Sequence, residues 1–292
     1  MNGINQITWK QKWLSYQSHP SSFLLLCFVL ISAATTVAVL LFLMGYILIK
    51  GIPNLNMDLF QLHYTSENAS LLPALCNTIL VTLLSLLLAV PLGVFSAIYL
   101  VEYAKRGNKL VSVIRITAET LSGIPSIVYG LFGMLFFVTT LKLGYSLLAG
   151  SLTLSIMLLP FIMRTTEEAL KSVPDSYREG SFGLGAGKLR TIFRIVLPAA
   201  IPGVLAGVIL ATGRIVGETA ALIYTAGTVA EIPKNILSSG RTLSVHMYAL
   251  ASEGLYMNQS YATAVVLLII VVIINSISNI VAHQLMKGHG NG

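Results

Sequence analysis

The chain has 292 residues, of which 55% are hydrophobic and only 10% are charged. A soluble domain usually carries about 25% charged residues, so this composition excludes a soluble enzyme or binding module and indicates an integral membrane protein. The net charge of +7 does not indicate nucleic-acid binding, because the basic residues are scattered in loops between apolar runs. Cys27 and Cys76 lie in or beside apolar runs and lack metal-ligand spacing.

Six apolar runs are long enough to cross a bilayer core of about 30 Å as helices, which predicts an all-α membrane protein. They cover residues 23–49, 71–100, 117–139, 147–163, 199–224 and 261–286. Pro91 and Gly93 predict a kink or break in the second run. Gly123 and Pro125 break the third, and broken backbone at membrane depth must line a cavity or be buried in protein. These two residues are therefore candidates for a hinge beside a substrate path.

The distribution of basic residues predicts the orientation of the chain. With the N-terminus inside, the inner segments hold Lys10, Lys12, Lys105, Arg106, Lys109, Arg115, Arg164, Lys171, Arg178, Lys188, Arg190, Arg194 and Lys287. The outer segments hold only Lys50, Lys142, Lys234 and Arg241. Residues 1–22 and 284–292 are thus expected in the cytoplasm.

The long outer segment 225–260 has an apolar patch at 243–250, which predicts a surface helix for an external partner. Its lone His246 is expected to be an ordinary surface or packing residue and not a ligand.

A polar, basic and glycine-punctuated stretch, residues 175–198, separates the fourth and fifth runs. Ser172-Val-Pro-Asp175 in front of it is a helix-start signal. Three glycines, Gly183, Gly185 and Gly187, then predict a turn, because glycine adopts conformations that other residues avoid. A second short helix is expected over 188–196, ending before Pro198. The stretch is predicted to form a helix–turn–helix on the membrane surface, against the simpler alternative of an ordinary basic loop.

Two charged residues, Arg214 and Glu218, lie inside the fifth run. Arg214 is about 24 Å along a helix that starts at Pro198, well inside the bilayer. A charge there costs about 2.5–3.5 kcal/mol on insertion scales, and such residues face a bundle interior or a water-filled cavity. With i,i+4 spacing the two share a helix face and can pair. Two pairs of glycines, Gly203 with Gly207 and Gly213 with Gly217, predict close approach of another helix.

Two interpretations of the Arg214–Glu218 pair remain open. The pair could be a salt bridge that only fixes helix packing. Alternatively, Arg214 contacts an anion in transit, since a guanidinium fork suits tetrahedral oxyanions, and Glu218 keeps binding weak enough for release. Arg115 and Glu119 form another i,i+4 pair, which is interpreted as an anchor at the membrane interface.

The stretch at 175–198 resembles the EAA loop of permease subunits in ABC importers. The matching residues are Glu179-Gly180-Ser181, then Gly185, then Ile195-x-Leu197-Pro198, with Gly180 and Ser181 in place of two alanines. In that family the loop docks into a groove of the ATPase subunit. The resemblance implies a docking surface made of Tyr177, Glu179, Gly180, Ser181, Phe182, Gly185, Ile195, Leu197 and Pro198.

A second resemblance covers residues from about 71 to 282. The segments 213–221 (GRIVGETAA) and 122–130 (SGIPSIVYG) resemble the phosphate-specific ABC transporter permeases of the PstA type, within the CysTW subfamily of binding-protein-dependent transport permeases. This implies a type I ABC importer permease domain over 71–283, with its coupling loop at about 164–198. In that family an arginine and a glutamate of this helix are implicated in phosphate passage, which implies substrate-path roles for Arg214 and Glu218.

The resemblance implies a multi-pass subunit of the bacterial inner membrane that forms half of a phosphate path. Implied partners are a second permease (PstC type), two copies of an ATPase (PstB type), an extracytoplasmic phosphate-binding protein (PstS type) and membrane lipid. The sequence lacks a Walker A motif, so we expect that the chain binds no cofactor directly, that ATP is used by the partner ATPase, and that the chain is not itself an enzyme. Alternatives are a permease for sulfate, molybdate or phosphonate, or a secondary transporter, for which inverted repeats and ion-coupling residues are missing.

Overall fold

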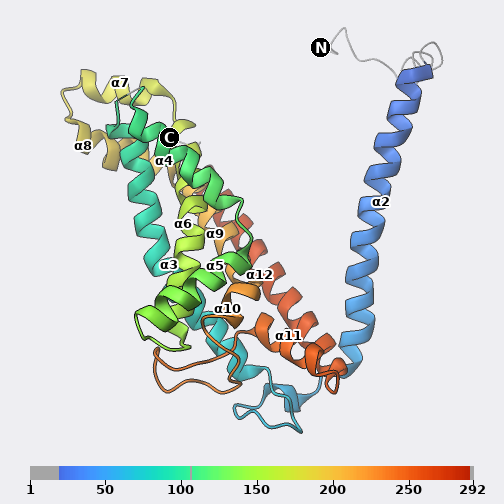
Figure 1. Cartoon of the computed structure of the whole chain (residues 1–292). Coiled ribbons are helices and arrows are strands. Elements are labelled where there is room, and N and C mark those ends of the chain that lie inside the picture. The colour runs from blue at the N-terminus through green and yellow to red at the C-terminus, as the bar shows by residue number, and fades with distance from the viewer. Residues whose placement is uncertain (1–19, 106, 290–292) are drawn as a thin grey trace. The chain divides into compact units, whose positions relative to one another are not determined.

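The computed structural model describes residues 20–105 and 107–289, and over these ranges it contains helices and connecting segments but no strand (Figure 1). Most of the predicted N-terminal segment 1–22 and the last three residues of the tail 284–292 lie outside these ranges. The chain divides into two units, residues 1–50 and 51–292. The first consists, in its described part, of the apolar helix α2 (Pro20–Gly51), which confirms the first predicted span and extends it at both ends.

The second unit is a helical bundle. In chain order its elements are η1 (Ile52–Asn54), η2 (Met57–Phe60), α3 (Leu72–Ile98), η3 (Tyr99–Tyr103), α4 (Lys109–Ser122), α5 (Ser126–Gly133), η4 (Met134–Thr140), α6 (Leu147–Lys171), α7 (Asp175–Gly183), α8 (Lys188–Thr191), η5 (Ile192–Val196), α9 (Leu197–Val216), α10 (Ala220–Ile223), α11 (Leu243–Glu253) and α12 (Met257–His289). Five helices of the described chain, α2 among them, are long and apolar enough to span a membrane. The third predicted span is a broken pair, α4 and α5–η4, bent by 100°, which brings the number of possible spans to six.

Helix α6 is the centre of the bundle and packs against both α3 and α9, while α12 packs against α9 (Figure 1). Hydroxyl groups join α6 to α3, since Ser155 Oγ donates to the Ser85 carbonyl at 3.1 Å and Ser85 Oγ donates to the Ser151 carbonyl at 3.3 Å. Such bonds between helices are typical of membrane bundles, where apolar surface alone gives little preference for one helix partner over another.

One of the two predicted glycine pairs allows close helix packing. A Cβ on Gly203 would lie 2.7 Å from the Ala169 Cβ of α6, and one on Gly207 would overlap Thr165. The other pair does not, because a Cβ on Gly213 would come no closer than 3.7 Å to Asn275 and one on Gly217 would meet only the backbone of its own helix. The prediction is therefore confirmed for the first pair and wrong for the second.

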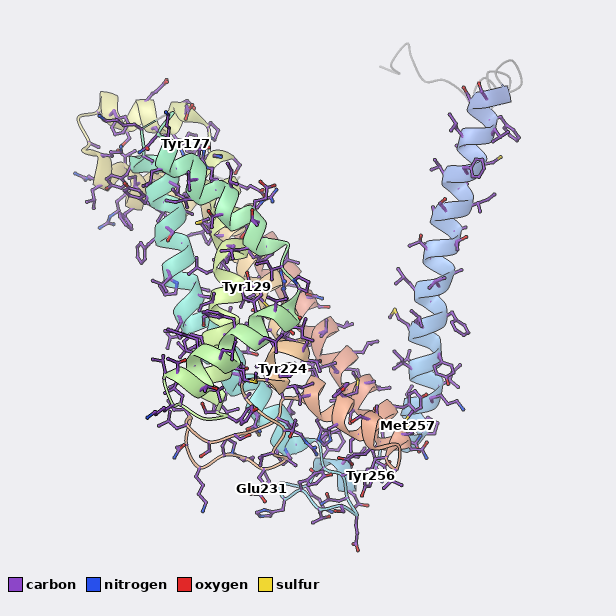
Figure 2. All side chains as sticks on the ribbon, in the orientation of Figure 1. Tyr129, Tyr177, Tyr224, Glu231, Tyr256 and Met257 are labelled. Carbon is purple, nitrogen blue, oxygen red and sulfur yellow. The ribbon has the colours of Figure 1, made fainter. Side chains whose placement is uncertain are left out.

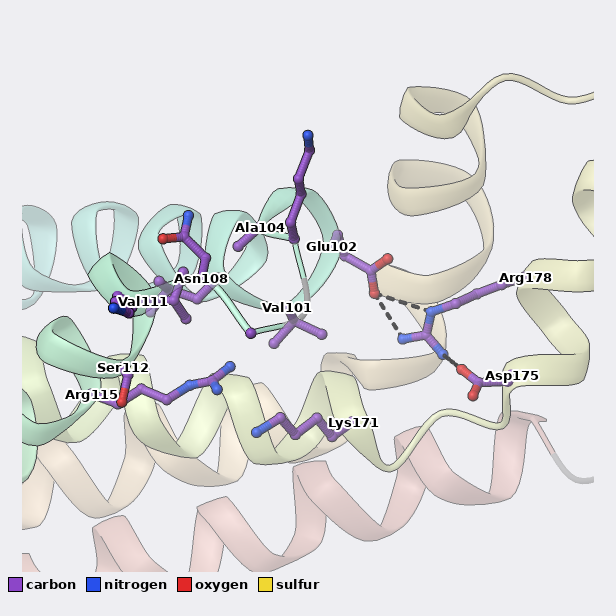
Figure 3. A pocket seen from close by; sticks show the side chains of 14 residues that line it. Val101, Glu102, Ala104, Asn108, Val111, Ser112, Arg115, Lys171, Asp175 and Arg178 are labelled. Carbon is purple, nitrogen blue, oxygen red and sulfur yellow. Dashed lines mark hydrogen bonds and ion pairs between the residues drawn. The ribbon is translucent and has the colours of Figure 1, made fainter.

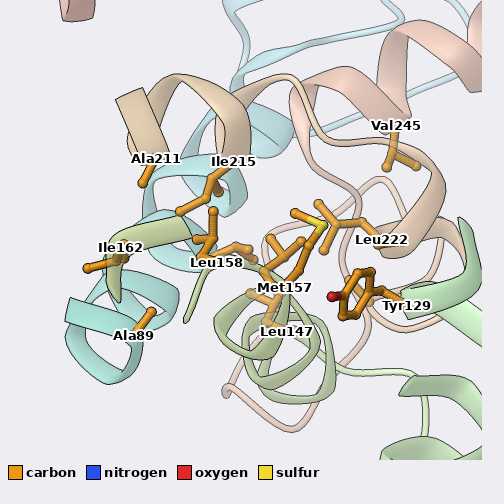
Figure 4. Packing of buried hydrophobic residues seen from close by; sticks show 14 residues of the cluster. Ala89, Tyr129, Leu147, Met157, Leu158, Ile162, Ala211, Ile215, Leu222 and Val245 are labelled. Atoms are coloured by element: carbon orange, nitrogen blue, oxygen red, sulfur yellow. The ribbon is translucent and has the colours of Figure 1, made fainter. Parts of the chain in front are cut away.

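The largest buried apolar cluster lies around the middle of α6. Met157 and Leu158 of this helix pack with Leu222 of α10 and Tyr129 of α5 (Figure 4). A second cluster, which includes Leu170, lies toward α7 and α8. Because both clusters include residues of α6, this helix connects the two ends of the bundle.

The structure differs from the sequence-based expectation at three places. Helix α3 continues through Pro91, so of the predicted kink or break the break is absent. The short helix at 188–196 does not stop before Pro198, because the wide π-type turn η5 leads into α9 and the Leu197 amide donates to the Ile192 carbonyl. A wider turn is one of the ways in which a helix accommodates the amide that proline lacks. Helix α9, in turn, ends at Val216 and does not reach residue 224.

The end of the bundle that carries α10 and α11 is held together through polar contacts with α3. Asn77 donates to the Arg241 carbonyl at 3.2 Å, and Thr78 accepts from the Leu243 amide at 2.8 Å. The helix predicted near 243–250 is present as α11, but it is packed into the bundle, with Leu250 and His246 fully buried. The other face of α11 is exposed, with Tyr248 at 53%, so the helix does lie at the surface, and its role toward an external partner stays a prediction. His246 packs as a buried residue.

Candidate functional site

Arg214 lies on the last turn of α9, and no other charged residue occurs between Leu197 and that position. Its side chain is exposed, and within the described residues it forms no ion pair or hydrogen bond. A cation on an apolar helix without a partner is unfavourable in a membrane. The position therefore calls for a polar neighbour from outside the described residues, such as a second subunit, water or a bound anion.

Glu218 does not share a helix face with Arg214, which corrects the predicted i,i+4 pair. The chain leaves the helix at Gly217, and the Glu218 amide donates to the Ile215 carbonyl at 3.0 Å. The Glu218 carboxylate then accepts from the Ala221 amide at 3.2 Å, at the start of α10. A carboxylate that accepts this amide favours a new helix start over continuation of α9. Glu218 is only 9% exposed and holds the break in place.

Helix α5 of the broken pair α4–α5 packs against the break between α9 and α10. Pro125 lies between the two helices, and Gly130 of α5 lies so close to Ala221 that a Cβ would approach the Ala221 Cα to 2.8 Å. The Tyr129 hydroxyl donates to the Leu121 carbonyl at 2.9 Å and lies within electrostatic range of Arg214. Figure 2 places Tyr129 between Tyr177 at the α7 end and Tyr224 toward the other end. The predicted break at Gly123–Pro125 is present, and its role as a hinge stays a prediction.

Helices α7 and α8 form the helix–turn–helix that the sequence predicts. Gly185 has φ +81°, a conformation that glycine adopts without strain, and it turns the chain between them. Tyr177 and Phe182 of α7 are 52% and 46% exposed, and Leu184 of the turn is 90% exposed. Exposed apolar side chains on a short polar helix are typical of an interaction surface.

The predicted docking residues divide into three groups by exposure. Tyr177, Glu179, Gly180, Phe182 and Gly185 are exposed. Ile195, Leu197 and Pro198 are half-buried in η5 and α9. Ser181 is 4% exposed, and its hydroxyl lies 2.8 Å from the Thr191 hydroxyl, so it joins α7 to α8 and does not contribute exposed surface. A hollow of about 750 Å³, lined by Gly185, Arg190 and Arg194 among others, lies on the same surface.

Arg178 is a residue whose importance the sequence analysis missed. Its guanidinium donates to one oxygen of Glu102 at 2.7 and 3.1 Å, to the carbonyls of Leu170 and Val173 at 2.9 and 2.8 Å, and to Asp175 at 3.3 Å. These partners belong to η3, which continues α3, to the end of α6 and its junction with α7, and to α7 itself. Arg178 thus fastens α7, which carries several of the predicted docking residues, to two spans. Its spacing of three residues after Asp175 was visible in the sequence, but its distant partner Glu102 was not.

Within the described residues no group of three or more His, Cys, Asp or Glu side chains is placed to hold a metal ion.

Residues 89–288 match the family described as binding-protein-dependent transport system inner membrane component. The chain is similar to a probable ABC transporter permease protein, YqgI, of Bacillus subtilis (strain 168), with 36% identity over 76% of this chain and 81% of the relative. It is also similar to the phosphate transport system permease protein PstA 1 of Mycobacterium tuberculosis (strain ATCC 25618 / H37Rv), with 42% identity over 53% of this chain.

The chain spans about half the length of that mycobacterial relative, 49%, and 63% of a Pasteurella multocida (strain Pm70) PstA that is 38% identical to it. Among solved structures, the fold resembles a chain of a bacterial alginate ABC transporter, with a TM-score of 0.68, 16% identity and coverage of 93% of this chain and 98% of that one. A chain of the MetNI methionine ABC transporter aligns with a TM-score of 0.56 and 20% identity over 73% of this chain and 93% of that one.

The fold is that of the permease subunits of type I ABC importers, in which ATP hydrolysis belongs to a separate subunit. The chain belongs to the binding-protein-dependent transport system inner membrane component family. It is therefore a multi-pass membrane permease and not the enzyme of its transport system.

Proposed function

We propose that this chain is the permease subunit of an ATP-driven, binding-protein-dependent phosphate importer and forms half of the translocation path. The observation that carries the proposal is Arg214, an exposed guanidinium without a partner in the described chain, at the end of an apolar helix. A guanidinium offers paired, charge-assisted donors to a tetrahedral oxyanion. The relatives named as phosphate permeases support phosphate over sulfate, molybdate or phosphonate.

The proposed substrate path contains Arg214 as the group that contacts the anion and Glu218 as a positioning residue. Glu218 acts through the α9–α10 break, because its carboxylate holds the Ala221 amide and not Arg214. Since α5 packs against this break, a change in the angle at Gly123–Pro125 would move Tyr129 relative to Arg214. This gives the broken pair a role as hinge beside the path.

The proposed partners are a related permease of the PstC type, two ATPase subunits of the PstB type and an extracytoplasmic binding protein of the PstS type. ATP closes the ATPase pair and moves α7, which we place in the cytoplasm together with both termini. Arg178 transfers this movement to α3 and α6, because it is bonded to η3, which continues α3, and to the end of α6. The two permease halves then turn outward, accept phosphate and release it inward past Arg214.

Uptake of labelled phosphate by cells that lack the gene for this chain tests the proposal. The wild-type chain should restore phosphate uptake without raising uptake of sulfate or molybdate. A Lys234→Gln variant, which changes an exposed lysine in the segment between α10 and α11, serves as a control and should restore uptake equally. Restoration of sulfate or molybdate uptake in place of phosphate would assign the permease to another oxyanion.

A further inference from the structure

A cavity of about 760 Å³ lies beside the docking helix, at the end of the bundle formed by η3, the start of α4 and the junction of α6 with α7 (Figure 3). Its volume is within the range of roughly 300–1,000 Å³ found for small-molecule sites. Five cationic side chains and two carboxylates line it, which makes it strongly basic. It is separate from Arg214 and has no role in the proposed path.

Arg178 contributes little charge to a ligand in this cavity, because both lining carboxylates already bind it. Glu102 and Asp175 accept hydrogen bonds from its guanidinium, as the dashed lines in Figure 3 show. The remaining four cations therefore face the cavity without any lining carboxylate of their own.

Two of these cations, Arg115 and Lys171, share a single carboxylate oxygen. Arg115 Nε lies 2.8 Å and Lys171 Nζ lies 2.6 Å from the same Oε1 of Glu167. One negative charge thus balances two positive charges, and Figure 3 shows the two cationic groups pointing toward one another across the cavity. Both side chains are about half-exposed, so they can reach a ligand as well as Glu167.

The other two cations, Lys105 and Lys109, form no ion pair with the described residues. Lys109 is the first residue of α4, whose first turn contains no acidic residue. The N-terminus of a helix carries about half a positive charge, so a lysine there is repelled unless an anion is nearby. The Asn108 side chain occupies only the Leu110 amide. An anion between α4 and Lys171 would relieve this repulsion.

We propose that this cavity binds a phosphate group, carried either by an anionic lipid headgroup or by a free phosphate. The cations supply the charge for a phosphate, and the partly exposed Val101 and Ala104 of the lining offer an apolar surface to the group that carries it. Basic pockets between membrane helices are suited to anionic headgroups. Because Asp175 and Arg178 belong to α7, a ligand here contacts the docking helix and couples its occupancy to the position of α7. The inference goes beyond the proposed function and holds whichever anion is transported.

Calorimetric titration of the full chain, purified in a neutral detergent, tests this site and separates the two sources. One arm uses short-chain phosphatidylglycerol, with phosphatidylcholine of the same tails as a control, and the other arm uses inorganic phosphate. Both arms are performed on an Arg214→Gln background, so that binding in the proposed path does not contribute. The test variant is K105Q/K109Q, and the matched control is K142Q/K234Q, which removes two exposed lysines elsewhere.

The proposal predicts saturable binding in at least one arm that K105Q/K109Q weakens about 30-fold, since each lysine near an anionic surface contributes about 1 kcal/mol. The control K142Q/K234Q should leave that affinity unchanged. Binding of phosphatidylglycerol alone assigns a lipid headgroup, and binding of inorganic phosphate alone assigns a free phosphate. Absence of binding in both arms, equal binding of phosphatidylcholine, or equal affinity of K105Q/K109Q and K142Q/K234Q would overturn it.

Discussion

Two arginines at different places in the bundle illustrate two uses of the same side chain. Arg178, between α7 and the ends of α3 and α6, is 15% exposed and donates to two carboxylates and two carbonyls. Arg214, at the α9–α10 break, is exposed and has no such partner among the described residues. The first is fixed by the fold, whereas the second is available to a group that the chain does not contain.

A third arginine, Arg241, shows that exposure must be considered together with bonding. Its Nε and Nη2 atoms also lack hydrogen-bond partners in the described part of the chain, but it is 4% exposed and its guanidinium stacks 4.6 Å from the Tyr64 ring centre. Contact with the aromatic ring gives this buried guanidinium a favourable neighbour within the chain. Only Arg214 of these three is both exposed and without a partner.

The largest expected effect is on transport through Arg214. Replacement by Gln should reduce phosphate uptake by roughly 100-fold, because loss of one partner of a desolvated charge pair costs about 2–5 kcal/mol. The free energy of unfolding should change by less than about 0.5 kcal/mol, as expected for an exposed side chain. Labelled-phosphate uptake and thermal unfolding in detergent measure the two quantities. Arg214→Lys keeps the charge but loses the paired donors of the guanidinium, so intermediate uptake is expected. Full uptake by the Gln variant would contradict the proposal that Arg214 contacts the anion.

The opposite pattern is expected for Arg178. Its replacement by Met leaves the carboxylate of Glu102, which is 8% exposed, without its partner and should lower the free energy of unfolding by about 3 kcal/mol. The double variant R178M/E102L removes both charges and should recover most of this stability. Thermal unfolding of the purified chain distinguishes these cases. Equal stability of wild type and Arg178→Met would mean that the ion pair does not fasten α7.

A change in pH should alter stability through the region around Arg241, because His246 lies beside it, and not through the regions around Arg178 and Arg214. Burial, with a further contribution from the charge of Arg241, lowers the pKa of His246 to about 3, compared with about 6.5 in an unfolded chain. Between these values the unfolded chain binds a proton that the folded chain does not, so stability is lost as the pH falls through this window.

At pH 5 the expected loss from His246 is about 2 kcal/mol relative to pH 7.5. A His246→Phe variant removes this group and should lose correspondingly less stability over the same range, when unfolding temperatures of both proteins are measured at the two pH values. An identical pH dependence of the two proteins would show that His246 titrates normally in the folded chain.

The last comparison distinguishes two glycines of α9, and it includes the smallest expected effect, that of Gly213→Ala. Gly207→Ala places a methyl group against Thr165 and should destabilise the bundle by about 1–3 kcal/mol. Gly213→Ala meets nothing within 3.4 Å and should be neutral or stabilising by up to about 1 kcal/mol, because alanine favours the helix. Chemical or thermal unfolding of the two variants provides the comparison. Similar losses for both would indicate that another helix also packs closely on Gly213.

The apolar runs of the sequence predicted the spans because bilayer thickness sets helix length directly. The turn at Gly185 was also predictable, since its glycine is needed for a local conformation. The pairing of Arg214 with Glu218 was not, because spacing implies a shared face only if the helix continues. Here Gly217 and the bond between Glu218 and Ala221 end it. The contact between Arg178 and Glu102 depends on tertiary packing and could not be found from local patterns.

The central claim is that this permease moves phosphate past Arg214 only when an ATPase drives α7. The most direct test measures labelled-phosphate uptake and ATP hydrolysis together in vesicles that contain the complete complex. The wild type should take up phosphate only with ATP, and the Arg214→Gln complex should hydrolyse ATP without uptake. Phosphate uptake in the absence of nucleotide, or normal uptake by the Arg214→Gln complex, would contradict the claim.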